Sequence, residues 1–418
     1  MLTYFDHAGS VRRRRRLGAL LLATLVLLTF LSCLPTHATA VPAIATSAKA
    51  YVLLDADSGQ IIAQQNATVR LPMASTTKIM TALVALELLE PDTMVCIDGR
   101  AVGIEGSSIY LYEGEWLSVE QLLLGLLLES ANDAAVALAI AACGSVEEFA
   151  GEMNRKALSL GLQDTHFENP HGLDAQTHYT TAYELGLITR EALSNPTLRR
   201  IMSTRRATIP LCEMRSPDQE ENPVSEDAQE AGCRVLLNHN KMLRYYQGAI
   251  GVKTGYTKRS GRCLVSAAER NGLTLIAVTL DAPDDWNDHT ALLDYGFSRY
   301  SRVSLCEVGE YQTLLPISGG TQAYVMVGNA QNASVTLPTT HGAIRCRVEL
   351  PRFLLAPVVT NKQLGSLIFL CDTDGDGVDE QIATLPLHTL YAVDAAPPPS
   401  LLTRIALFFQ QLFSKHSP

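Results

Sequence analysis

Residues 50–90 show two hydrophobic patterns, the first typical of strands and the second of a helix. Apolar residues at 50–54 and 61–63 flank the turn residues 55–60, which predicts a β-hairpin. Residues 76–90 are apolar on nearly every helical face, which predicts a buried helix.

The chain beyond residue 120 continues as a mixture of helices and strands. Helices are expected at 122–128 and 134–142, with a polar break at 129–133 between them. Two strands and one further helix are then expected, at 264–268, 273–280 and 288–295. Central helices followed by strands are typical of an α+β fold, so we expect an α+β domain over residues 41–300.

After residue 300 the pattern changes to short strands separated by turn residues. These strands are expected at 323–327, 333–337, 344–350 and 366–370. They predict a second, β-rich domain over residues 301–395.

The N-terminal 40 residues contain the three parts of a secretory signal. Arg12–Arg16 form a basic region, residues 17–32 an apolar region, and Ala38–Ala40 a small-residue cleavage site. We therefore expect a signal peptide at residues 1–40 that is removed on export. A permanent anchor is one alternative, although 16 apolar residues are fewer than the ~20 that span a bilayer. A lipid-modified Cys33 is the other alternative.

The C-terminal segment 396–418 joins a proline spacer to an amphipathic stretch. Pro397–Pro399 end any preceding element and stiffen the chain. Apolar residues then recur with a helical period, at 401, 402, 405, 408, 409, 412 and 413. We expect an amphipathic helix that lies in the membrane surface, and the alternative is a helix packed on the protein's own core.

Charge and cysteine content exclude some classes of function. The chain has 418 residues, a net charge of −10 and no basic face, so we expect no nucleic-acid binding. Its nine cysteines form no CxxC pair, which argues against a zinc ribbon or a thioredoxin-like site. Because exported chains can form disulfides, we expect a bridge from Cys212 to Cys233 around an acidic loop, with buried free cysteines as the alternative.

Three short motifs follow one another along the chain. They are Ser75–Lys78 (S-x-x-K), Ser130–Asn132 (S-x-N) and Lys253–Gly255 (K-T-G). Each motif alone is a weak signal, and the structural alternative for the first is a serine that merely caps a helix. Their joint occurrence in this order points to one serine active site.

The motif residues suggest a division of catalytic roles. Ser75 is expected to be the nucleophile and Lys78 the general base, because they lie three residues apart on one helical face. Lysine acts as a base only when it is neutral, and burial and a second cation, Lys253, both lower its pKa. Ser130 is expected to carry a proton to the leaving group.

The remaining motif residues are expected to bind substrate. Asn132 suits a substrate amide, and the strand of Lys253–Gly255 suits a peptide added at a sheet edge. Gly255 allows the substrate backbone to approach closely. The backbone N–H groups of Ser75 and Tyr256 are expected to form the oxyanion hole.

These motifs and their surroundings resemble the serine D-Ala-D-Ala carboxypeptidases, the low-molecular-mass penicillin-binding proteins. The matching segments are Pro72–Ala82, Asn169–Asp174, Asn238–Lys241 and Gly251–Thr257. The resemblance implies a transpeptidase-like catalytic domain, a small C-terminal β-sandwich and a membrane-binding tail. It also implies that Ser75 attacks the D-Ala-D-Ala bond of the cell-wall stem peptide, that water hydrolyses the acyl-enzyme, and that β-lactams acylate the same serine.

The sequence departs from the family pattern at the site for the substrate carboxylate. Some relatives use an Arg after the K-T-G strand, but residues 280–289 contain none. Thr254, Thr257 and Arg262 are the alternatives for this role. The middle motif, Ser130–Asn132, reads Ser-Ala-Asn rather than the Ser-Asp-Asn of class A β-lactamases, which suits the carboxypeptidases.

Two further features have structural interpretations. Asp372–Asp379 resembles the first half of a calcium loop, but Ala383 occupies the twelfth position, so we expect a hairpin turn. His171 is expected to be structural, because Lys78 already serves as the base. No metal and no cofactor are expected.

We therefore expect an exported D-alanyl-D-alanine carboxypeptidase at the outer face of the cytoplasmic membrane or in the cell wall. Its substrate would be the peptidoglycan stem pentapeptide. The alternatives within enzymes are a DD-endopeptidase and a β-lactamase-like hydrolase. A different class, an inactive wall-binding or β-lactam-sensing protein, is disfavoured because all three motifs are intact.

Overall fold

The computed structural model describes residues 44–211 and 232–398, together with Ser400, Leu402 and Ile405. The predicted signal peptide, the acidic loop and nearly all of the predicted tail helix lie outside these residues. Among the described residues, no single helix is long and apolar enough to cross a membrane. The helices Asn132–Cys143 and Val146–Ser159 meet that test only when they are counted as one segment. The chain bends by 84° between them.

A five-stranded antiparallel sheet, ordered β2-β1-β9-β8-β7, forms the first half of the structure. Its strands are β1 (Ala50–Asp55), β2 (Ile61–Gln65), β7 (Ala249–Thr257), β8 (Gly261–Arg270) and β9 (Leu273–Leu280). The predicted hairpin is confirmed, since β1 pairs with β2. The predicted strands near 264–268 and 273–280 are also confirmed. Strand β7, which carries the K-T-G motif, lies at one edge of the sheet.

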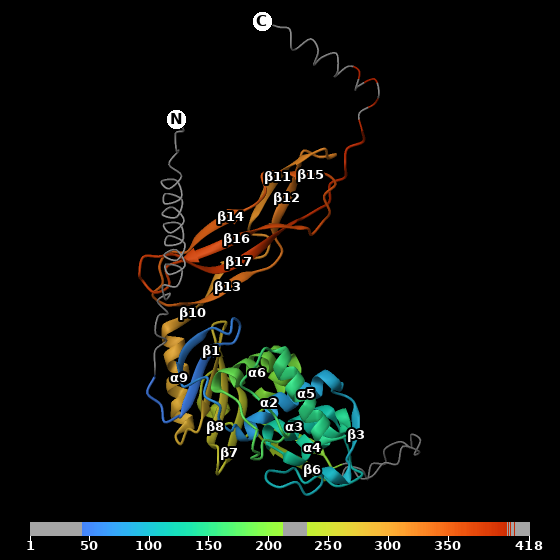
Figure 1. Cartoon of the computed structure of the whole chain (residues 1–418), viewed down its shortest axis with the longest axis vertical. Coiled ribbons are helices and arrows are strands. Elements are labelled where there is room, and N and C mark those ends of the chain that lie inside the picture. Colours follow the sequence, from blue (N-terminus) through green and yellow to red (C-terminus); the bar gives the residue numbers. More distant parts are fainter. Residues whose placement is uncertain (1–43, 212–231, 399, 401, 403–404, 406–418) are drawn as a thin grey trace, which may run out of the picture. The chain divides into compact units, whose positions relative to one another are not determined.

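Alternate residues of β1 bury against different layers, as the period of a strand requires. Tyr51 and Leu53 pack with α9 (Asp285–Arg299) on one face of the sheet. Val52 and Leu54 join the helical core on the other face. Figure 1 shows α9 on one side of the sheet and α2, α3, α4, α5 and α6 on the other. The sheet is therefore covered on both faces.

The helical layer is built around α2, which packs against α3, α4, α5 and α6. Its helices are α2 (Lys78–Leu88), α3 (Val119–Leu128), α4 (Asn132–Cys143), α5 (Val146–Ser159), α6 (Ala182–Ser194) and α7 (Pro196–Ser203). The short helix α8 (Met242–Tyr245) instead contributes Met242 to the core on the α9 face. The apolar runs at 76–90, 122–128 and 134–142 thus predicted α2, α3 and α4. Because α2 is buried on most of its surface, it needs no polar face and forms the centre of the layer.

Short elements complete this half of the molecule. They are the 3-10 turns η1 (Ala74–Thr77) and η2 (Gly99–Ala101) and the strands β3 (Met94–Cys96), β4 (Trp116–Ser118), β5 (Arg206–Pro210) and β6 (Cys233–Leu237). The predicted bridge to Cys233 is wrong in this structure, where Cys233 is a free and exposed thiol. Strands β5 and β6 pair in a register that places Pro210 opposite Cys233. Cys212 itself lies outside the described residues.

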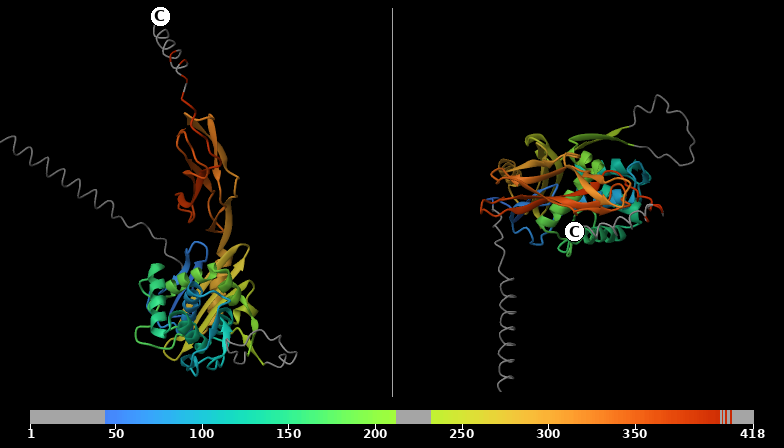
Figure 2. Two further views of the ribbon diagram at one scale, coloured as in Figure 1. Left: turned by 90° about the vertical axis from the view of Figure 1, so that its right-hand side faces the viewer. Right: turned by 90° about the horizontal axis from the view of Figure 1, so that it is seen from above.

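From residue 300 onward, the described residues between the strands form turns and loops, without a helix before Leu402. The strands are β10 (Tyr300–Cys306), β11 (Gln312–Ser318), β12 (Tyr324–Asn329), β13 (Ala333–Pro338), β14 (Arg345–Glu349), β15 (Leu354–Leu355), β16 (Gln363–Cys371) and β17 (Glu380–Thr389). Six form a sheet in the order β14-β16-β17-β12-β11-β15, and β10 pairs with β13. Their inward side chains form a separate apolar core, and Figure 2 shows these orange-to-red strands running alongside one another.

The segment Asp372–Asp379 connects β16 to β17, as the predicted hairpin requires. The carboxylates of Asp372, Asp374 and Asp376 lie within 4.8 Å of one another. The Asp372 carboxylate accepts hydrogen bonds from the backbone N–H groups of Gly375 and Gly377, at 2.7 and 3.0 Å. These aspartates therefore hold the backbone of the turn.

Candidate active site

Ser75 lies in the 3-10 turn η1, one turn before the point where α2 begins at Lys78. The preceding Ala74 adopts a left-handed conformation with φ of 48°, which makes the backbone turn sharply before the serine. The Thr77 hydroxyl donates to the Ala74 carbonyl at 2.8 Å and so fastens this turn. Ser75 is half-buried, so its hydroxyl is both held in place and accessible.

Two glycines allow other segments to approach the turn. A Cβ on Gly172 would lie 2.0 Å from the Ala74 carbonyl oxygen, which no side chain tolerates. A Cβ on Gly255 would lie 3.0 Å from the Ser75 backbone nitrogen. The edge strand β7 therefore passes directly against the backbone of the candidate nucleophile.

The Lys78 side chain connects three segments of the site. Its ammonium group is completely buried and lies 3.0 Å from the Ser75 hydroxyl oxygen. It also donates to the Asn132 side-chain oxygen at 2.7 Å and to the His171 carbonyl at 2.6 Å. The S-x-x-K and S-x-N motifs thus meet at one nitrogen atom.

The surroundings favour the neutral form of Lys78. Burial lowers its pKa well below 10.5, and the nearby Lys253 lowers it further, while Asp133 acts in the opposite direction. Burial also lowers the pKa of Lys253, to about 7. A lysine whose pKa is lowered in this way can act as a base toward Ser75.

Ser130 and Asn132 come from the break between α3 and α4. Ser130 is buried and has φ of 63°, a left-handed conformation that ends α3 and turns the chain into α4. Asn132 is the first residue of α4. Its side-chain nitrogen donates to the Glu105 carbonyl at 2.5 Å, and its backbone N–H donates to the Ser107 carbonyl at 2.7 Å. The loop around residue 106 therefore orients the amide toward Lys78.

The K-T-G residues lie on β7, at the edge of the sheet that adjoins η1. Lys253 is buried and donates to the Thr254 carbonyl at 2.8 Å. Tyr256, the next residue on β7, is 66% exposed. An unpaired strand edge beside Ser75 presents backbone donors and acceptors to an extended peptide.

The structure distinguishes the three candidates for the carboxylate site. The Thr257 hydroxyl donates to the Asp174 carboxylate at 2.9 Å. Arg262 forms an ion pair with Asp285 at 3.0 Å. Within the described residues, the Thr254 hydroxyl has no hydrogen-bond partner, which leaves it the most available of the three for a ligand.

Two histidines lie close to the site, His171 partly buried and His178 buried. The His171 ring accepts a hydrogen bond from the Leu173 N–H at 3.2 Å, and burial lowers the pKa of His171 to about 3. The His178 ring accepts from the Glu168 N–H at 3.0 Å and contacts the Thr77 hydroxyl at 2.8 Å. Sequence reasoning overlooked His178, whose partner Thr77 lies about a hundred residues earlier in the chain.

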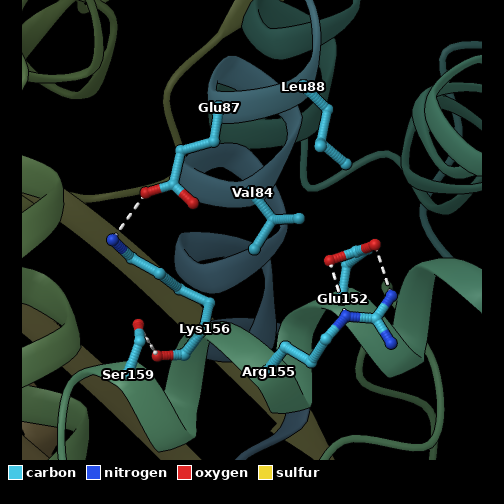
Figure 3. Close-up of a pocket in the computed structure, with 7 residues that line it drawn as sticks. All are labelled: Val84, Glu87, Leu88, Glu152, Arg155, Lys156 and Ser159. Atoms are coloured by element: carbon cyan, nitrogen blue, oxygen red, sulfur yellow. Dashed lines mark hydrogen bonds and ion pairs between the residues drawn. The ribbon is translucent and has the colours of Figure 1, made fainter.

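A separate cavity of about 260 Å³ lies between α2 and α5, at the end of α2 away from Ser75. Figure 3 shows that its charged side chains pair with one another, Lys156 with Glu87 at 2.5 Å and Arg155 with Glu152. None of the motif residues lines this cavity. The candidate active site is therefore the cluster around Ser75.

Several known proteins resemble this chain over most of its length. The family profile described as D-alanyl-D-alanine carboxypeptidase matches residues 36–284, which is more than half of the chain. The chain is 30% identical over 339 residues to D-alanyl-D-alanine carboxypeptidase DacF of Bacillus subtilis, covering 79% of this chain and 83% of that protein. It is 34% identical over 301 residues to the D-alanyl-D-alanine carboxypeptidase of Streptomyces sp. strain K15, covering 68% and 99%.

Solved structures show the same likeness. Penicillin binding protein 5 from Haemophilus influenzae superposes with a TM-score of 0.67 and 27% sequence identity, covering 84% of this chain and 98% of that one. The resemblance seen in the motifs is thus confirmed over most of the chain. On these grounds the chain belongs to the D-alanyl-D-alanine carboxypeptidase family.

Proposed function

We propose that this protein is a serine D-alanyl-D-alanine carboxypeptidase that removes the terminal D-Ala from peptidoglycan stem pentapeptides. Family membership supports the hydrolase activity. The observation that carries the mechanism is the buried Lys78 nitrogen, 3.0 Å from the Ser75 hydroxyl oxygen and with a lowered pKa.

In the acylation step, Ser75 attacks the carbonyl carbon of the penultimate D-Ala. Neutral Lys78 accepts the serine proton as the new C–O bond forms. The negative charge then develops on the carbonyl oxygen, where the backbone N–H groups of Ser75 and Tyr256 stabilise it. The close approach of Gly255 to the Ser75 nitrogen supports this placement of two N–H groups at one site.

Collapse of the tetrahedral intermediate breaks the C–N bond to the terminal D-Ala. The leaving nitrogen takes a proton, which Lys78 supplies through Ser130. Water then attacks the acyl-enzyme and loses its proton to Lys78, while the Ser75 oxygen is released as a hydroxyl. The products are free D-Ala and the shortened stem peptide, and no cofactor is consumed.

Substrate recognition follows from the surroundings of Ser75. The stem peptide adds to the free edge of β7 and Asn132 binds one of its amides. The terminal carboxylate is bound by the Thr254 hydroxyl near the positive charge of Lys253. Support for Thr254 comes from its lack of another partner among the described residues, whereas Thr257 and Arg262 are already engaged.

Further elements of the proposal concern organisation and location. Residues 1–40 form an export signal, 41–300 a transpeptidase-like catalytic domain, and 301–395 a small β-sandwich domain. Residues 396–418 attach the protein to the outer face of the cytoplasmic membrane through a proline spacer and an amphipathic helix. The separate apolar core of β10–β17 supports an independent second domain.

The deciding experiment compares three substrates with the purified protein. It measures D-Ala released from a stem pentapeptide, monomer released from a cross-linked dimer, and hydrolysis of penicillin. We expect release from the pentapeptide to be fastest and to disappear in Ser75→Ala. If the cross-linked dimer is cleaved fastest, the protein is a DD-endopeptidase. If penicillin is hydrolysed fastest, it is a β-lactamase-like hydrolase. If no substrate is turned over, it is an inactive wall-binding or β-lactam-sensing protein.

A further inference from the structure

We propose that Asp133 is a positioning residue for the acylation step. Its buried carboxylate fastens the loop 105–111 to the start of α4, and this loop holds Asn132 against Lys78. The inference rests on the proposed function, because acylation of Ser75 is the step by which it is measured. Asp133 directly follows the S-x-N motif but was not predicted as a site residue.

The hydrogen bonds of Asp133 connect two separate segments. The carboxylate is completely buried and accepts from the Ser108 hydroxyl at 2.6 Å. It also accepts from the backbone N–H groups of Ile109 and Leu111, at 3.2 and 3.0 Å. A residue that only capped α4 would bond to that helix alone. Asp133 makes one such bond, from the Ala134 N–H at 2.9 Å. Three of its four bonds instead reach the loop.

The other end of the same loop holds Asn132. The Glu105 and Ser107 carbonyls accept from the Asn132 side chain and backbone, at 2.5 and 2.7 Å. A Cβ on Gly106 would lie 2.7 Å from the Asn132 side-chain nitrogen, so the loop backbone passes directly over the amide. With its nitrogen committed to Glu105, the amide directs its oxygen toward Lys78.

Asp133 also contributes charge to the site. Two charged groups from different elements act on the pKa of Lys78, Lys253 from β7 and Asp133 from α4. His171 and His178 lie on the loop before α6, and the charge of Lys78 helps to lower their pKa values. Both histidines are held neutral by burial, and Asp133 is the anion of this group. Its loss would therefore weaken the orientation of Asn132 and also remove a charge that favours protonated Lys78.

The test uses three variants of the full chain. Asp133→Asn removes the charge at almost constant volume. It also replaces one of the two accepting carboxylate oxygens by an NH₂ group, which cannot accept a hydrogen bond from the loop. Ser108→Ala removes one bond to the loop but keeps the charge. Asp92→Asn makes the same charge change on the exposed surface and serves as the control. Each protein is measured for its rate of acylation by labelled penicillin between pH 4 and 9, and for its melting temperature.

For Asp133→Asn we expect acylation to slow about 100-fold at its optimum, the effect of misplacing a catalytic group by about 1 Å. The acidic limb of its pH profile should move to lower pH by about half a unit or more, because Lys78 loses a neighbouring anion. For Ser108→Ala we expect acylation to slow by roughly 3- to 10-fold, because Asn132 is displaced less. The acidic limb should not move, because the Asp133 charge is kept. Asp92→Asn should match the parent protein.

Specific results would overturn the inference. One is a folded Asp133→Asn protein with the parental acylation rate, or with a reduced rate and an unmoved acidic limb. If Asp133→Asn does not fold, an unchanged acylation rate in Ser108→Ala overturns it instead. Absence of acylation in the parent protein would refute the proposed function itself, which separates the two failures.

Discussion

Lys78 is a cationic residue type in a completely buried position, and this placement explains its chemistry. Removing an ammonium ion from water is costly unless an anion compensates, so burial shifts the equilibrium toward the neutral amine. The polar atoms that contact it are a serine hydroxyl, an amide oxygen and a carbonyl oxygen, all uncharged. The site therefore supplies orientation for Lys78 without a direct ion pair that would hold its proton.

Replacing Lys78 by methionine tests its role as the base. We expect Lys78→Met to slow acylation by penicillin by about 10²- to 10⁴-fold, the usual contribution of general base catalysis. The measurement is the acylation rate, followed with a fluorescent penicillin. Lys258→Met is the matched control, since Lys258 is exposed on the turn after β7. Acylation of Lys78→Met at the parental rate would show that another group takes the serine proton.

A second residue-level prediction concerns stability in acid. Burial lowers the pKa of His289 from 6.5 to about 3, and those of His171 and His178 to about 3 and 4. Between those values and pH 6.5, the unfolded chain binds protons that the folded chain does not. The contribution of these histidines to the unfolding free energy is therefore fully present above pH 6.5. It decreases as the pH is lowered toward 4.

The variant His289→Gln isolates one of these contributions away from the active site. His289 lies on α9 and contacts the Thr279 hydroxyl at 2.9 Å. From pH 7 to 5 we expect the parent to lose about 2 kcal/mol more unfolding free energy than the variant. Urea unfolding at the two pH values measures this difference. If both proteins lose the same unfolding free energy between pH 7 and 5, His289 is not a neutral, buried imidazole in the folded state.

The individual motif residues were predictable because their types and spacing carry chemistry. The short distance between Ser75 and Lys78 follows directly from their three-residue separation on one turn. The roles of Asp133 and His178 were not predictable. Each depends on contacts with segments remote in sequence, the loop near residue 108 and the turn near residue 77. Such contacts exist only after the fold brings the segments together.

At the level of elements, β7 lies directly against η1, the turn that carries the proposed nucleophile. Gly255 permits this approach, because a Cβ there would lie 3.0 Å from the Ser75 nitrogen and 3.1 Å from the Ala74 Cβ. In the proposed mechanism, the separation of the strand and the 3-10 turn sets the width of the oxyanion site.

Gly255→Ala should therefore impair catalysis more than folding. We expect about a 100-fold loss of acylation rate, because displacement of β7 misaligns the two N–H donors. Gly151→Ala is the control, since its nearest contact is 3.7 Å away and it lies within α5. That control should retain full activity and gain about 0.5–1 kcal/mol of unfolding free energy. An active Gly255→Ala protein would contradict the close contact.

Apolar pattern predicted the most buried elements and overlooked the partly buried ones. The helix α2 and the strands β8 and β9 are apolar over most of their length and were predicted at nearly their observed positions. Helix α5 buries only Phe149, Ala150, Met153 and Ala157, so its pattern is less distinct.

At the scale of the whole molecule, the chain combines parts of different character. Family similarity ends near residue 284 in the profile, whereas DacF of Bacillus subtilis is similar over 339 residues, which is 79% of the chain. The strands β10–β17 were predictable as a β-rich region because turn residues interrupt short apolar runs. Their order in the sheet was not, because the strand order β14-β16-β17-β12-β11-β15 does not follow the chain.

The proposed tail is tested by membrane association. Protein ending at residue 396 should remain soluble and should still react with penicillin, whereas the full chain should sediment with anionic lipid vesicles. Replacing Phe408 and Phe409 by serine should also abolish sedimentation, since these residues lie on the apolar stripe. Gln411→Ser on the polar face is the control and should still sediment. Vesicle binding by the truncated protein would refute the tail as the membrane anchor.

The most direct test of the central claim is to identify the residue that penicillin acylates. The mature protein is incubated with penicillin, digested and analysed by mass spectrometry. The account predicts one penicilloyl adduct, on Ser75, that is absent from Ser75→Ala and strongly reduced in Lys78→Met. No adduct, or an adduct that persists in Ser75→Ala, would contradict the acyl-serine mechanism.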